Sequence, residues 1–114
     1  MNQADLIEKA ISELFVREKA YVEACKELAV AEADYRRKRA MTYLNADGTV
    51  ADRNAQADLE CWEEHKRKLA AEATVALTKA LLEDCRGVLS ARQSILSAQA
   101  KANYAMDLHA MKQI

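Results

Sequence analysis

The stretch Asn45-Ala46-Asp47-Gly48-Thr49 is the one clear interruption in a sequence that otherwise favours helix. Asn and Asp favour turns, and glycine adopts a positive φ angle without steric cost. Thr49 and Asp52 stand three residues apart, as the two partners of a capping box do, with aspartate in place of the longer glutamate. The pattern predicts a first helix over about residues 3–44, a turn over residues 45–49 and a second helix over about residues 50–110.

Apolar residues on both sides of this turn recur at helical spacing, in steps of three and four residues. The line in the first helix is Ile7, Ile11, Leu14, Tyr21, Cys25, Leu28 and Tyr35. The second helix begins with a stripe of Leu59, Trp62, Leu69, Ala73, Ala76 and Ala80. Two heptad repeats follow, Leu81, Val88 and Ile95, and, one position over, Val75, Leu82, Leu89 and Leu96. Together these lines make apolar faces that are wider than the contact between two helices requires.

Composition agrees with long helices in a single domain over residues 1–114. The chain has no proline, two glycines and only 5% aromatic residues, and much of its 51% apolar share is alanine. Alanine allows helices to approach closely but buries little surface, which favours a thin coiled-coil-like arrangement over a thick globular core. A five-residue turn requires the two helices to pack antiparallel. We therefore expect an all-α protein built as a long antiparallel helical hairpin.

The second helix is expected to be the longer one, about 90 Å against about 60 Å. The N-terminus of the first helix should then lie near Ser90, and the rest of the second helix should overhang. Apolar residues keep helical spacing in this overhang: Ile95, Ala98, Ala102, Ala105, Leu108 and Met111. A frayed tail is one interpretation. We favour a homo-oligomeric helical bundle, a dimer or larger, in which another copy or a partner protein covers these residues.

No arrangement of residues indicates an enzyme or a cofactor site. Cys61 and His65 lie four residues apart on one helical face, but zinc needs three or four protein ligands and the other cysteines are distant in the hairpin. A buried cysteine beside a surface histidine is the simpler interpretation. A two-helix hairpin offers no pocket for a catalytic nucleophile and its base, and neither glycine belongs to a phosphate-binding loop. We expect no catalytic residues, no metal, no cofactor and no small-molecule substrate.

Two basic runs, residues 36–39 and 65–68, raise the alternative of a nucleic-acid contact. Arg36, Arg39 and Tyr35 share a face near the turn, and cations beside an aromatic ring suit phosphates and stacked bases. Against this, the net charge is −1, and acidic residues stand close enough to neutralise the basic runs. We expect nucleic-acid binding to be weak.

Targeting signals are not evident. The first residues, MNQADLIEKA, carry acidic side chains early, unlike a signal peptide, and no uncharged apolar stretch approaches the length of a membrane span. Three widely spaced cysteines do not suggest a disulfide framework. These features predict a soluble cytoplasmic protein without a membrane partner.

Three segments resemble a family of short, helical, mostly uncharacterised bacteriophage proteins. The segments are AEADYRRKRAMTYL at residues 31–44, ADGTVADRNAQADL at 46–59 and CRGVLSARQSILSAQA at 85–100. The resemblance covers about two-thirds of the chain and supplies no catalytic residues. It implies a phage gene of the early or recombination region, and hence a location in the host cytoplasm.

Three functions are therefore compatible with the sequence. The first is a self-associating adaptor that binds another phage or host protein, either from the recombination machinery or a host factor that the phage inhibits. The second is a nucleic-acid-binding accessory protein that uses the basic residues near the turn. The third is a virion or scaffold component that assembles. We favour the first.

Overall fold

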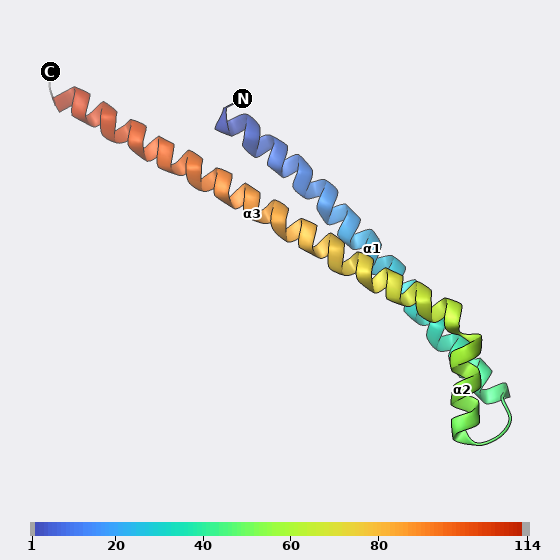
Figure 1. Ribbon diagram of the computed structural model, residues 1–114. Helices are drawn as coiled ribbons and strands as arrows, with labels where there is room; N and C mark the ends of the chain where they lie inside the picture. Colours follow the sequence, from blue (N-terminus) through green and yellow to red (C-terminus); the bar gives the residue numbers. More distant parts are fainter. Residues whose placement is uncertain (1, 113–114) are drawn as a thin grey trace. The chain divides into compact units, whose positions relative to one another are not determined.

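The computed structural model describes residues 2–112, and within that range its regular structure is entirely helical. Helix α1 spans Gln3–Asn45, α2 spans Val50–Glu60 and α3 spans Trp62–Lys112, with lengths of 43, 11 and 51 residues (Figure 1). This confirms the all-α helical hairpin that the sequence predicts.

The turn between α1 and α2 is built as its residues suggest. Gly48 has a φ angle of 102°, which only glycine adopts readily. The Thr49 hydroxyl accepts a hydrogen bond from the Asp52 backbone N–H at 3.2 Å, and the Asp52 carboxylate accepts one from the Thr49 N–H at 3.1 Å. These two bonds form a capping box that satisfies N–H groups otherwise lacking partners at the start of α2.

The chain folds into two compact units, each with its own internal contacts. One is Lys19–Lys79, which holds the second part of α1, the turn, α2 and the start of α3. The other combines the chain up to Glu18 with the chain from Ala80 onward, so it holds the first part of α1 and most of α3.

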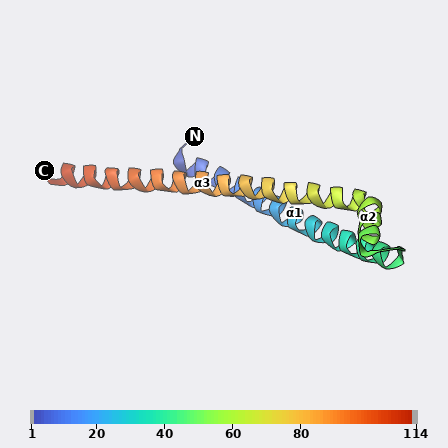
Figure 2. The same cartoon turned by 60° about the horizontal axis from the view of Figure 1, so that its bottom comes forward.

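In the unit Lys19–Lys79, the helix expected to run unbroken from residue 50 is divided at Cys61. The Cys61 angles, φ −98° and ψ 14°, depart from helical values, and α2 changes direction from α3 there in both views (Figures 1 and 2). Ala57 and Cys61 are both fully buried, and the Cys61 sulfur lies 3.9 Å from the Thr42 hydroxyl. Tertiary packing against α1 is the physical reason for the break, since position 61 holds neither proline nor glycine.

The contact between α1 and α3 in this unit passes through small residues. Ala24, Ala31 and Ala71 are buried, whereas Cys25, named in the expected apolar line, is half-buried beside Ala24. Alanine at these positions lets the two helices approach closely, and the larger neighbours flank the contact.

The stripe expected at the start of the second helix faces outward instead. Leu59 is 79% exposed and Trp62 55% exposed, and Ala73 and Ala76 are exposed as well. The side of α3 that faces α1 carries Ala71 and half-buried Val75. Apolar residues recur at helical intervals on both of these neighbouring faces, so their spacing alone did not show which face packs against α1.

In the other unit, the first part of α1 lies beside α3, and α3 continues past the start of α1 (Figures 1 and 2). Ala10 and Leu82 are buried and Leu89 is half-buried. The heptad series of Leu82 and Leu89 is therefore the one that packs against α1. Arg86 and Glu18 form an ion pair at 3.9 Å at the side of this contact.

Candidate protein-binding surface

The C-terminal part of α3 presents its apolar residues to solvent. Every described residue from 93 to 112 is exposed. The six residues expected to mediate association all lie in this segment: Ile95, Ala98, Ala102, Ala105, Leu108 and Met111. Ile95 and Leu108 are 40% and 39% exposed.

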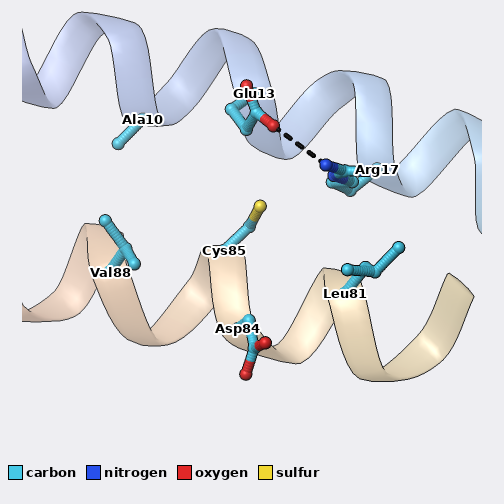
Figure 3. Close-up of a pocket in the computed structure, with 7 residues that line it drawn as sticks. All are labelled: Ala10, Glu13, Arg17, Leu81, Asp84, Cys85 and Val88. Carbon is cyan, nitrogen blue, oxygen red and sulfur yellow. Dashed lines mark hydrogen bonds and ion pairs between the residues drawn. The ribbon is translucent and has the colours of Figure 1, made fainter. Parts of the chain in front are cut away.

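A shallow apolar groove lies between α1 and α3 in the same unit. Figure 3 shows Ala10, Cys85 and Val88 around its floor and side. The ion pair between Glu13 and Arg17, 3.2 Å long, lines the α1 rim. The floor is apolar because alanine, cysteine and valine side chains line it.

The groove and the exposed segment share one face of α3, the outer face. We define it by two interleaved heptad series. The first series is Leu81, Val88, Ile95, Ala102 and His109, and the second is Asp84, Ala91, Ala98, Ala105 and Lys112. Val88, at 51% exposure, borders the groove, while Asp84 points away from α1 (Figure 3). The outer face is thus adjacent to the side that packs on α1. Leu81 is half-buried beside the groove, whereas the described residues of the face from Ile95 onward are exposed.

The basic strip near the turn is not formed as a free cationic surface. The Arg39 guanidinium donates to the Asp58 carboxylate at 3.0 Å and to the Asn54 side chain at 3.2 Å. Tyr35 packs against the His65 ring at 5.2 Å. Arg36 lies 3.9 Å from the Glu32 carboxylate. Arg39 and Tyr35 do lie together, since Asp58 and, less strongly, Tyr35 raise the pKa of Arg39, but each of the three residues also has another partner within the protein.

Other basic residues in the unit Lys19–Lys79 also pair across its helices. Lys38 Nζ donates to Glu64 Oε1 at 2.7 Å, and this hydrogen bond raises the pKa of Lys38 and lowers the pKa of Glu64. Arg67 donates to Glu27 and Asp34, each at 2.9 Å, and the bond to Glu27 contributes most to its raised pKa. These ion pairs join α1 to α3 and consume cationic charge that a nucleic acid would need.

Cys61 lies between α2 and α3, and His65 lies in the first turns of α3. Cys61 is buried beneath Thr42, and His65 packs among Tyr35 and Trp62. The part of the chain that the structure describes contains no group of three or more His, Cys, Asp or Glu residues placed to hold a metal ion.

Sequence reasoning missed the bridge from Arg67 to α1. Its two partners, Glu27 and Asp34, are 40 and 33 residues away, so no local spacing rule reveals the contact. Only the register of the hairpin brings them together. The one available signal was that Glu27 and Asp34 are seven residues apart and so lie on one side of a helix.

Comparison with known proteins does not assign the chain to a family. No protein-family model matches the chain, and neither a curated protein nor a solved structure shows significant similarity to it. Among the described helices, none combines the length and apolar character that a membrane crossing requires.

Proposed function

We propose that this chain is a non-enzymatic, self-associating helical adaptor that acts by binding protein. The observation that carries the proposal is the outer face of α3. Ile95 and Ala102 lie exposed on that face, in the part of α3 that continues past the start of α1 (Figures 1 and 2). Apolar side chains repeated at heptad spacing on an uncovered helix are typical of surfaces that pack against another helix.

The biological setting is also a proposal. The resemblance of the turn region and of residues 85–100 to short phage proteins suggests a phage-encoded protein active in the host cytoplasm. Its partner would be a component of the phage recombination machinery or a host factor that the phage inhibits.

The arrangement of charge favours protein over nucleic acid as the partner. Arg39, Lys38 and Arg67 each have acidic partners at 3.0 Å or less. A nucleic-acid surface would need these cations free to contact phosphates, and each phosphate contact would have to replace an ion pair already made.

Affinity capture with a matched control tests the adaptor function. Full-length protein, the variant Ile95→Asp/Ala102→Asp and the control Gln93→Asp/Ala100→Asp would each be used on infected and uninfected host lysates. Gln93 and Ala100 lie on the opposite side of α3 from the outer face. The proposal predicts a protein that is retained by the full-length chain and the control but lost by the outer-face variant. Equal retention by all three would contradict it.

A further inference from the structure

The break between α2 and α3 is confined to Cys61. The Cys61 N–H donates to the Ala57 carbonyl at 3.0 Å, and the His65 N–H donates to the Cys61 carbonyl at 2.9 Å, as in an uninterrupted helix. No proline or glycine stands between residues 50 and 86. Moving the Cys61 ψ angle from 14° to about −42°, with a smaller change in φ, would restore helical geometry. The local sequence therefore does not require the break.

Polar contacts with one short stretch near the end of α1 hold α2 at its angle to α3. The Arg39 guanidinium donates to the Asp58 carboxylate at 3.0 Å and to the Asn54 side chain at 3.2 Å. The Arg53 guanidinium lies over the Tyr43 ring, 5.8 Å from its centroid. Because the Asp58 side chain is 65% exposed, its ion pair stabilises this contact only weakly.

Apolar burial between α2 and α1 is also small. Of the residues of α2 only Ala57 is buried, together with Cys61 at its end, and both side chains are short. Directly after the break, Glu64 Oε2 and His65 Nδ1 are enclosed without a hydrogen-bond partner among the described residues, which lowers the stability of this arrangement. A segment with so little apolar burial can open locally before the whole protein unfolds.

We propose that α2 is a hinged segment, which opens from α1 and then continues α3 as one straight helix. Cys61 is the hinge at one end of α2, and the turn is the hinge at the other. The capping box of Thr49 and Asp52 moves with α2, since both residues lie at its start. Residues 45–50 span up to about 17 Å when extended, about the length of α2 itself, so the turn can follow the movement. This inference does not depend on the proposed function.

Opening of α2 changes what the turn end of the protein presents to a partner. In the closed form, Ala57 and Cys61 are hidden and the Arg39 guanidinium is occupied by Asp58 and Asn54. In the open form, the buried side of α2 is exposed and the guanidinium is free. The hinge is thus a conformational device that controls access to the end of α1.

Labelling of the Cys61 thiol tests whether α2 opens locally. The full chain carries Cys25→Ser and Cys85→Ser, so that only Cys61 can react. We expect Cys61 to react faster than the measured free energy of unfolding allows, and with a weak dependence on low urea concentrations, because local opening exposes little surface. A reaction that occurs only through global unfolding, with its full dependence on urea, would contradict the proposal.

Two variants locate the opening. Arg39→Ala removes contacts that hold α2 and should speed the labelling of Cys61 about threefold or more. Arg67→Ala removes two ion pairs between α1 and α3 that persist when α2 opens, so it should leave the rate nearly unchanged. An equal increase in both variants would show that α1 separates from α3 as well, and no increase in Arg39→Ala would show that α2 does not open. Either result would overturn the inference.

A carboxylate at the buried position of α2 tests the straight form. Ala57→Glu cannot fit against α1 and should open α2, whereas Ala55→Glu places the same side chain at an exposed position of α2 and is the control. We expect Cys61 to react about tenfold or more faster in Ala57→Glu than in the control, with helix content retained in circular dichroism. An unchanged rate would contradict the hinge.

Loss of helix in Ala57→Glu would also contradict the proposal. A loss equal to the 11 residues of α2 would show that α2 unfolds instead of joining α3. A larger loss would show that the rest of the unit Lys19–Lys79 depends on the contact between α2 and α1.

Discussion

Lys38 Nζ on α1 lies 2.7 Å from Glu64 Oε1 on α3, the shortest ion pair reported between these helices. Lys38 stands in the middle of the basic run that suggested nucleic-acid binding, and Glu64 precedes the second basic run. Lys38, which looks like part of a cationic surface in the sequence, therefore links α1 to α3. Because both side chains remain accessible to solvent, the link orients the helices more than it stabilises them.

The pH dependence of this link has a defined sign. The folded state lowers the pKa of Glu64, chiefly through its hydrogen bond with Lys38. Its contribution to stability is therefore complete above the ordinary glutamate range and is lost as pH falls through the lowered pKa of Glu64. We expect Glu64→Gln to lower the urea midpoint slightly at pH 7 and to have no effect at strongly acidic pH. Urea unfolding followed by circular dichroism at several pH values measures the difference, and a constant difference across that range would contradict the account.

The contact between α1 and α3 has no room at position 31 for a side chain larger than alanine. Ala31 is 1% exposed, so we expect Ala31→Leu to force α1 and α3 apart and to lower the free energy of unfolding by about 1–3 kcal/mol. The matched change Ala33→Leu places the same side chain at an exposed position of α1 and should be within about 0.5 kcal/mol of neutral. Chemical denaturation compares them. Equal effects of the two changes would place the contact elsewhere on α1.

Glycine at the turn is required by both its backbone angle and its surroundings. A Cβ atom at Gly48 would lie 2.7 Å from the Asp52 carboxylate, and the φ angle of 102° is itself unfavourable for alanine. We expect Gly48→Ala to cost about 1–3 kcal/mol of stability. Gly87→Ala is the control, because its Cβ would meet nothing within 4 Å in a helix, and it should stabilise the helix by up to about 1 kcal/mol. A Gly48→Ala variant as stable as the wild type would indicate a different turn.

The three cysteines should differ in reactivity. Cys61 is fully buried, whereas Cys25 and Cys85 are half-buried. We expect a water-soluble thiol reagent to modify Cys61 last in the folded protein, and all three at similar rates in denaturant. Mass spectrometry of peptides after timed labelling assigns each site. Early modification of Cys61 would show that α2 detaches from α1 readily.

The sequence predicted the elements that depend on local chemistry. Gly48, Thr49 and Asp52 define the turn and the start of α2 because the positive φ angle and the capping hydrogen bonds involve residues only a few positions apart. The end of α1, at Asn45, follows from the same turn residues.

Features that depend on tertiary packing were not predictable in the same way. On the second helix, apolar residues recur at helical spacing along several neighbouring lines. Spacing therefore left open whether Leu69 or Ala71 faces α1, and the structure buries Ala71. The break at Cys61 has no local signal, since it follows from packing of Ala57 and Cys61 against α1. The exposed segment beyond Arg92 was predictable because it requires only the lengths of the two helices.

The most direct test of the account is the subunit number of the full-length chain and of two variants, measured by light scattering after gel filtration at micromolar to tens of micromolar protein. Ile95→Asp/Ala102→Asp places two carboxylates on the outer face of α3, and Gln93→Asp/Ala100→Asp places them on its opposite side. The account predicts an oligomer for the full-length chain and for the control, and a helical monomer for the outer-face variant. A monomeric full-length chain, or an outer-face variant with an unchanged subunit number, would contradict it.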